Sequence, residues 1–253
     1  MLDDEYTPES DKWFSQRLSS PSSDAASRSS ALLTYRLIYA LENERHAPEI
    51  LPYPAEAISG AISKIVECTA IARQAEENER RDAEDSADGV SLLPFRPSDI
   101  IKLELQRIRF FLTDLLRTRL RKIKSLCTRI TSEPTLSQPR PPEAVLYRPL
   151  LSDNERIVAD RLTEIFETSV QRSGLQFAPA ALQKLTPNLP HGEGEEILPE
   201  PNLNTRVFVL ALEDLGDVEL APDVVQHVSP GEIFLVPYRT FRSFIVDGRA
   251  RLV

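Results

Sequence analysis

The feature that most constrains this 253-residue chain is a segment between Pro97 and Pro134 that contains no other proline and no glycine. Pro97 and Ser98 offer a helix start, and Asp99 places an acid in the first turn. About 33 residues at about 1.5 Å each predict a helix of about 50 Å, well beyond the roughly 30 Å of a small domain. Such a helix must pack against more than its own domain.

The apolar residues of this segment form one broad stripe. At about 100° per residue, one face collects Ile101, Leu105, Ile108, Leu112, Leu115, Leu116, Ile123, Leu126 and Ile130. Leu103, Phe110 and Phe111 lie off this stripe, so the first half of the helix is apolar nearly all round. This pattern is typical of an element buried between two bodies. We therefore expect another chain to cover part of the helix.

Basic residues are concentrated on the same segment. Residues 98–130 hold nine lysines and arginines against three acids, although the whole chain has a formal net charge of −9. Arg117, Arg121 and Lys124 project opposite the stripe, whereas Arg119 falls within it. We expect Arg119 to pair with a carboxylate between Glu42 and Glu49, because an unpaired buried charge lowers the stability of the fold by several kcal/mol.

The basic set has three open interpretations. The cations can form salt bridges within and between chains, they can be solvated, or they can contact phosphates. In the last case the chain would be a helical nucleic-acid-binding protein that uses the basic face of the 98–130 helix. No aromatic residue lies among the basic residues after Phe111, so a base-stacking platform is not indicated. Salt bridges are the preferred interpretation.

The rest of the chain predicts an α+β fold. Apolar spacing predicts helices over 31–46, from Ile58 to Thr69 and over 152–171, with an exposed helix end and an acidic loop between Glu76 and Asp88. Short β-branched runs at 207–212, 217–220, 233–238 and 250–253 predict strands. We expect a mainly helical N-terminal (A) domain with one long central helix, and a small β-rich C-terminal (B) domain.

Composition divides the chain into four expected parts. These parts are a flexible tail over 1–30, a helical A domain over 31–177, a Pro- and Glu-rich linker over 178–204, and the B domain over 205–253. A module of about 50 residues with neither disulfide nor metal is marginal alone, so we expect it to dock on a helical domain. The final run ARLV predicts a strand, with Leu252 and Val253 held by pairing and apolar burial.

The sequence lacks the motifs of most enzymes. Its histidines, His46, His191 and His227, form no HExxH, and it has neither GxGxxG nor a P-loop. The two cysteines form no CxxC pair, which favours a reducing compartment. We expect no catalytic residues, no cofactor and no metal. No signal-peptide pattern and no run of about 18 apolar residues occurs, so we expect neither secretion nor a membrane span.

Three stretches resemble a known family, in that family's order. They are ENERHAPEILPY (42–53), LLPFRPSDIIKLELQRIRFFLTDLLRTRLRKI (92–123), and PNLNTRVFVLALEDLGDVEL (201–220) with GEIFLVPYR (231–239). They are similar to the Sld-five-type subunit of the GINS replication complex. The resemblance implies a nuclear scaffold without chemistry of its own, in an obligate heterotetramer with the three other GINS subunits. That tetramer joins the MCM ring and the Cdc-forty-five-type protein in the eukaryotic replicative helicase, and any DNA contact is indirect.

The pattern and the resemblance together predict residues at subunit interfaces or in structural roles. These are Glu44, Pro48, Glu49, Phe95, Asp99, Arg107, Phe110, Phe111, Arg117, Arg119, Leu252 and Val253.

Overall fold

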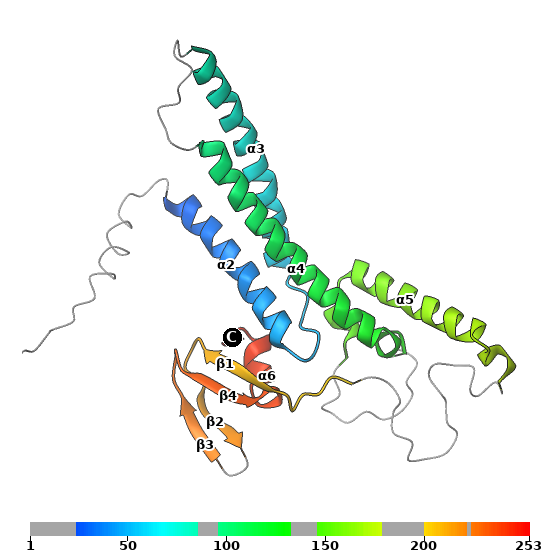
Figure 1. Ribbon diagram of the computed structural model, residues 1–253. Helices are drawn as coiled ribbons and strands as arrows, with labels where there is room; N and C mark the ends of the chain where they lie inside the picture. The colour runs from blue at the N-terminus through cyan, green and yellow to red at the C-terminus, as the bar shows by residue number, and fades with distance from the viewer. Residues whose placement is uncertain (1–23, 86–95, 133–145, 179–199, 222–223) are drawn as a thin grey trace, which may run out of the picture. The chain divides into compact units, whose positions relative to one another are not determined.

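The computed structural model describes residues 24–85, 96–132, 146–178, 200–221 and 224–253. Its longer helices are α2 (Asp24–His46), α3 (Ala55–Asp85), α4 (Pro97–Ser132) and α5 (Asp153–Arg172), as Figure 1 shows. Two short 3-10 helices, η2 (Arg148–Leu150) and η3 (Leu175–Phe177), flank α5. The predicted long central helix is confirmed. Within the described ranges, no helix combines the length and the apolar character that a membrane span requires.

The C-terminal part is β-rich. Its strands are β1 (Arg206–Ala211), β2 (Gly216–Ala221), β3 (Val224–Val228), β4 (Ile233–Pro237) and β5 (Ala250–Leu252), with α6 (Tyr238–Val246) between the last two. β1 lies between β4 and β5 in an antiparallel sheet, while β2 and β3 form a separate antiparallel pair. The predicted α+β class, with a helical part and a small β-rich module, is confirmed.

The chain groups into two compact units. Unit 1 comprises residues 1–37 and 57–108, and unit 2 comprises residues 38–56 and 109–253. The β-rich module therefore shares a unit with the segment after α2 and with the second half of α4. The expected domain boundaries stay predictions, because 1–23 and 179–199 lie outside the described residues. Helix α2 begins at Asp24, inside the expected tail.

In unit 1, polar contacts join α3 to the start of α4. The Glu79 carboxylate accepts hydrogen bonds from the Ser98 N–H at 2.8 Å and the Ser98 hydroxyl at 2.7 Å, and Lys102 pairs with Glu76. Glu79 thereby satisfies one of the free N–H groups at the start of α4. We expected an acidic loop to begin near Glu76, but the chain is helical as far as Asp85. The expectation is therefore wrong for residues 76–85. The Ala, Glu and Arg residues of this segment favour a helix, and two of its acids bind α4.

In unit 2, the second half of α4 supplies a helical core. The residues of this buried cluster are Ile50, Ile123, Leu126, Ile130, Tyr147, Leu151 and Ala159. Helix α5 starts with a capping box, in which the Ser152 hydroxyl accepts from the Glu155 N–H and the Glu155 carboxylate accepts from the Ser152 N–H. The capping box fixes the Glu155 carboxylate at the first turn of α5.

Helix α6 and strand β3 were not predicted from the sequence. The α6 segment YRTFRSFIV is rich in aromatic and β-branched residues, which resembles a strand. Tyr238, Phe241 and Ile245 nevertheless recur at helical spacing, and all three are buried in the module core. The helix ends at Val246, and Gly248 just beyond it has a φ of 76°, which suits glycine, and donates its N–H to the Ile245 carbonyl.

Candidate subunit interface

Arg119 is the largest fully buried side chain among the described residues. It makes five hydrogen bonds, as many as a guanidinium has N–H groups. Nε and Nη2 donate to the two oxygens of Glu155 at 2.8 and 3.1 Å, and Nη1 donates to Glu44 at 2.9 Å. The carbonyls of Leu51 and Leu150 accept the other two. The expectation that Arg119 pairs with a carboxylate between Glu42 and Glu49 is confirmed by Glu44.

Two opposing effects act on the Arg119 guanidinium. Burial alone would lower its pKa, but hydrogen bonds to Glu155 and the charges of Glu44 and Glu155 raise the pKa above its usual value. A fully paired buried cluster adds little net stability over apolar packing, whereas loss of one partner strands a charge. The cluster therefore fixes geometry, because it ties α4 to the last turn of α2, to the segment after α2 and to the first turn of α5.

Lys122 binds the same acidic segment one turn later. Its Nζ donates to Glu44 Oε1 at 2.9 Å and to the Glu49 carbonyl at 2.7 Å, and also to the Glu44 carbonyl. Burial lowers the pKa of Lys122, and the nearby Arg119 charge lowers it further, which outweighs the effect of Glu44. Together, Arg119 and Lys122 hold residues 44–51 against α4.

Glu49 extends these contacts to the β-rich module. Its carboxylate is 1% exposed, and Oε1 accepts from the Tyr238 hydroxyl at 2.8 Å and from Arg242 Nε, both on α6. No described residue hydrogen-bonds to the other oxygen, Oε2. Burial, and then the charge of Glu49, raises the pKa of Tyr238, so the phenol stays a donor. A buried carboxylate thus joins the module to the helical part of unit 2.

Apolar and backbone contacts complete this docking. Ala47 and Leu51 belong to the buried cluster that forms the module core. The Leu252 N–H donates to the Asn43 side chain at 2.8 Å, and Leu252 itself is fully buried. The expected docking of the module on helical residues is therefore seen within unit 2.

The strand expected at the end of the sequence is confirmed, with one correction. β5 pairs with β1, and the Val253 N–H donates to the Phe208 carbonyl at 3.1 Å. The expected burial holds for Leu252 but is wrong for Val253, which is 47% exposed. Successive residues of an extended chain point to opposite faces, so both could not face the same core.

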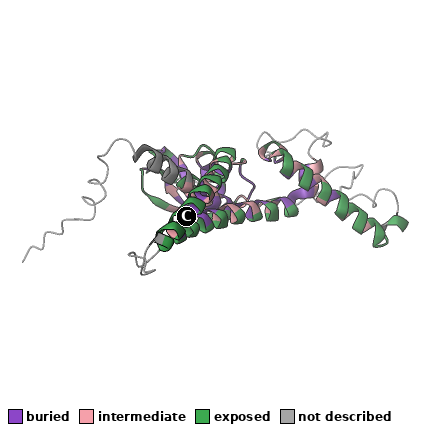
Figure 2. Cartoon of the chain, turned by 90° about the horizontal axis from the view of Figure 1, so that it is seen from above, coloured by how far each residue is buried: buried purple, intermediate pink, exposed green. Residues whose placement is uncertain are grey.

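Large apolar side chains are exposed on several elements, and Figure 2 colours the exposed residues of every kind green. Unit 1 exposes Ile62, Val66, Ile100 and Leu103, and unit 2 exposes Phe110, Phe208, Ile233 and Leu235. Leu103 and Phe110 on α4 are 67% and 62% exposed. Phe208 lies opposite Leu235 on adjacent strands, so their side chains form a pair on the outer sheet face. Contiguous exposed apolar surface marks protein contact sites, and we take the exposed apolar residues of each unit, each by itself, as candidate interface residues.

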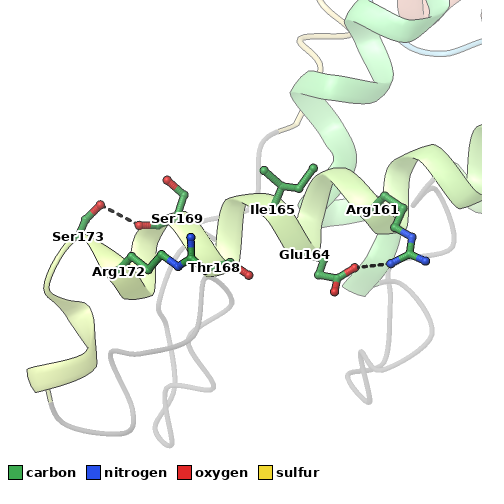
Figure 3. A pocket seen from close by; sticks show the side chains of 7 residues that line it. All are labelled: Arg161, Glu164, Ile165, Thr168, Ser169, Arg172 and Ser173. Atoms are coloured by element: carbon green, nitrogen blue, oxygen red, sulfur yellow. Dashed lines mark hydrogen bonds and ion pairs between the residues drawn. The ribbon is translucent and has the colours of Figure 1, made fainter.

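A pocket of about 650 Å³ lies along α5 (Figure 3). Its lining is Arg161, Glu164, Ile165, Thr168, Ser169 and Arg172 of this helix, and Ser173 at its C-cap. The ion pair of Arg161 with Glu164, at 3.0 Å, leaves neither charge free. These groups line one helix and do not converge from several elements, as the groups of a small-molecule site do. The described part of the chain also holds no group of three or more His, Cys, Asp and Glu side chains that could bind a metal ion.

Comparison with known proteins finds one family match in the helical part of the chain and another in the β-rich module. A family model described as GINS complex protein helical bundle domain matches residues 72–172. A second, described as DNA replication complex GINS protein SLD5 C-terminus, matches residues 201–253. The chain belongs to the SLD5 family of GINS subunits.

Proteins of the SLD5 family are similar to this chain over most of its length. DNA replication complex GINS protein SLD5 of Mus musculus is 27% identical over 241 residues, which cover 91% of this chain and 95% of the mouse protein. The Homo sapiens protein of that name is 26% identical over the same shares of both chains. The Schizosaccharomyces pombe protein is 24% identical over 212 residues, or 83% of this chain and 87% of the yeast protein.

The predicted site residues of this SLD5-family chain fall into two groups. Glu44, Glu49 and Arg119 come together in the buried cluster, with Pro48 half-buried in the same segment and Leu252 in the adjoining module core. The others lie apart from it: Asp99, Arg107, Phe110, Arg117 and Val253 are exposed, and Phe111 is half-buried with its ring 5.7 Å from that of Phe110. Phe95 lies outside the described residues. Their subunit contacts stay predictions.

Sequence reasoning missed Glu155, Tyr238 and Arg242. The serine before α5 and the glutamate three residues later form a recognisable capping-box pattern, which could have placed Glu155 at a helix start. The aromatic spacing in 238–245 could have revealed α6. No local signal could have shown that Glu155 binds Arg119, because the two residues lie 36 positions apart.

Proposed function

We propose that this chain is a non-catalytic scaffold subunit of a heterotetrameric GINS complex. As an SLD5-family chain it is a GINS complex subunit in DNA replication. The finer proposal is that it assembles with the three other GINS subunits, and that this tetramer joins the MCM ring and the Cdc-forty-five-type protein in the replicative helicase. The proposed location is the nucleus.

The observation that carries the scaffold role is the exposed apolar surface of α4. Leu103, at 67% exposure, and Ile100, at 54%, lie one turn apart. Burying a leucine side chain contributes about 1.5–3 kcal/mol, so a solvated row of such residues favours association. The buried charges described above are consistent with the same role, because the groups of the Arg119 cluster pair with one another.

The domain arrangement is part of this proposal. A helical domain over 31–177 would carry most subunit contacts, and the module over 205–253 would dock on residues 43–51 of its own chain. The tail, which ends where α2 begins at Asp24, and the linker over 178–204 would connect to other factors or span between domains.

Co-expression tests the proposal. The chain is produced with the three other GINS subunits, and the mass of the purified assembly is measured by light scattering. We expect one copy of each subunit. Leu103→Asp should prevent assembly or weaken it at least about tenfold, since it places a charge in an apolar contact.

A matched control is Gln171→Asp, which adds the same charge at an exposed polar position of α5. We expect it to assemble like the wild type. A wild-type chain that stays apart from the other subunits would overturn the proposed function.

A further inference from the structure

One face of α4 in unit 2 is basic, partly apolar and free of acids. At about 100° per residue, an arc of about 120° contains Arg109, Phe110, Arg117, Leu120, Arg121 and Lys124. All six are exposed. They span about 22 Å of the helix at about 1.5 Å per residue.

The cations of this face differ from exposed cations elsewhere on the helices. Arg80, Arg107 and Arg161 each pair with an acid three or four residues along their own helix. In contrast, no described residue forms an ion pair with Arg117, Arg121 or Lys124. Asp114 lies one turn before Arg117, but Arg45 binds it.

The spacing of these cations is unfavourable in the isolated chain. Arg117 and Arg121 are four residues apart, and Arg121 and Lys124 are three apart, so like charges lie side by side on one face. Like charges at these spacings on one helix face repel each other and destabilise the helix. An anionic partner would relieve this repulsion. The face is basic although the whole chain has a formal net charge of −9.

The apolar members of the face decide which class of partner fits. Phe110 is 62% exposed and Leu120 is 42% exposed, so each has apolar surface to bury. A phosphate backbone offers only charge to this face, whereas a protein helix can offer carboxylates and apolar side chains together. Phe110 and Leu120 are about 15 Å apart along the axis, a distance that one straight helix can bridge.

We propose that the α4 face from Arg109 to Lys124 binds an acidic, amphipathic helix of another GINS subunit. The carboxylates of that helix pair with Arg117, Arg121 and Lys124, and its apolar residues cover Phe110 and Leu120. This inference rests on the proposed tetramer and specifies the partner chemistry at one surface of it.

The test uses the full chain co-expressed with the three other subunits. The triple variant R117Q/R121Q/K124Q is compared with wild type and with the control R80Q/R161Q, whose arginines are exposed but paired locally. We expect the dissociation constant of the triple variant to rise about tenfold or more at low salt, with a weaker dependence on salt concentration. The control should match wild type.

A carbodiimide cross-link gives a second readout, because it joins a lysine amine directly to a carboxylate. In the wild-type assembly we expect Lys124 to be linked to an acidic peptide of another subunit, and to resist acylation by an amine-reactive ester.

The outcomes separate the two proposals. If the wild type assembles but the triple variant assembles equally well and Lys124 stays open to acylation, this inference is wrong and the proposed function stands. If the wild type binds duplex DNA with a steep salt dependence that the triple variant loses, the face is a nucleic-acid site and the inference is also wrong. If the wild type does not assemble at all, both proposals fail.

Discussion

At the scale of single residues, charge burial decides which substitutions matter. Arg119 and Arg121 are two positions apart on α4, yet Arg119 is 0% exposed and Arg121 is exposed. Arg119 bonds two carboxylates and two carbonyls, and Arg121 has no ion-pair partner among the described residues. The same residue type therefore fixes structure at one position and stays available for binding at the other.

This contrast predicts different costs for the two alanine variants. Arg119→Ala should lower the free energy of unfolding by about 3–5 kcal/mol, because it leaves Glu155 and part of Glu44 buried without a countercharge. Arg121→Ala should change it by no more than about 0.5 kcal/mol. Urea unfolding followed by circular dichroism measures both. Equal midpoints for the two variants would contradict the placement of Arg119 as a buried charge.

The sequence could predict one partner of Arg119 but not the other. An arginine on an apolar stripe needs a carboxylate, and the acidic segment 42–49 was the source expected from the sequence, which the structure narrows to Glu44. Glu155 lies three residues after Ser152, which is the spacing of a capping box. A role at the start of α5 is therefore enough to explain a glutamate at this position. Only the three-dimensional structure shows that its carboxylate serves both the helix start and Arg119.

At the scale of elements, side-chain contacts link α5 to its surroundings in unit 2. Asp160 on α5 accepts two hydrogen bonds from Arg148 of η2, at 2.8 and 3.0 Å, and one from Thr131 of α4 at 3.3 Å. The Arg148 hydrogen bonds, and then its charge, hold the pKa of Asp160 below its usual value despite partial burial. The contact thus depends on an ionised carboxylate.

This shift predicts a loss of stability in acid. A lowered pKa in the folded state means that the contribution of Asp160 is fully present above the unfolded pKa of about 3.9, and that it is lost as pH falls through the folded pKa. The destabilisation caused by Asp160→Asn should therefore shrink between pH 6 and pH 2.5. Urea unfolding at both pH values checks this. Because both side chains are partly exposed, at 33% and 41%, we expect a small effect.

Arg148→Gln is the natural control for that experiment. It removes the same pair from the other side, so the double variant should cost little more than either single variant at pH 6. Additive costs would show that Arg148 does not act through Asp160.

Strand β5 carries the second prediction at this scale. Deletion of Arg251–Val253 removes the pairing of Leu252 with Val209, the fully buried Leu252 side chain and its hydrogen bond to Asn43. We expect the module to become sensitive to protease and tetramer assembly to weaken, with the helical circular-dichroism signal nearly unchanged. Burial of one leucine contributes about 1.5–3 kcal/mol, a large share for so small a module. Unchanged protease resistance after the deletion would contradict a dependent, docked module.

Elements with strong periodicity were predictable, and elements that depend on distant partners were not. Helix α4 was predicted within two residues of its observed ends, because its apolar stripe is long and uninterrupted. The last turns of α3 were not, since Glu76 and Glu79 resemble a solvated acidic loop until α4 supplies Lys102 and Ser98. Helix α6 was missed because its aromatic residues favour a strand locally and become helical against the module core.

At the scale of the whole molecule, exposed apolar surface predicts poor behaviour of the isolated chain. Leu103, Phe110, Phe208, Ile233 and Leu235 are all more than half exposed. We expect the chain alone to self-associate at micromolar concentration and to become monodisperse when co-expressed with its partners. Light scattering over a dilution series measures this. A single folded monomer across that series would show that these surfaces need no partner.

The contact of Glu49 with Tyr238 also sets an order of events during synthesis. The two residues are 189 positions apart, so at about 5–20 residues per second Tyr238 leaves the ribosome roughly 10 to 40 s after Glu49. Arg119 and Lys122 appear well before α6, which means that α4 can hold residues 44–51 while the surface for the module is still uncovered. During that interval the nascent chain presents a carboxylate and two apolar residues, Ala47 and Leu51, to whatever is nearby. A chaperone or a partner subunit that reaches this segment first would compete with the chain's own last residues.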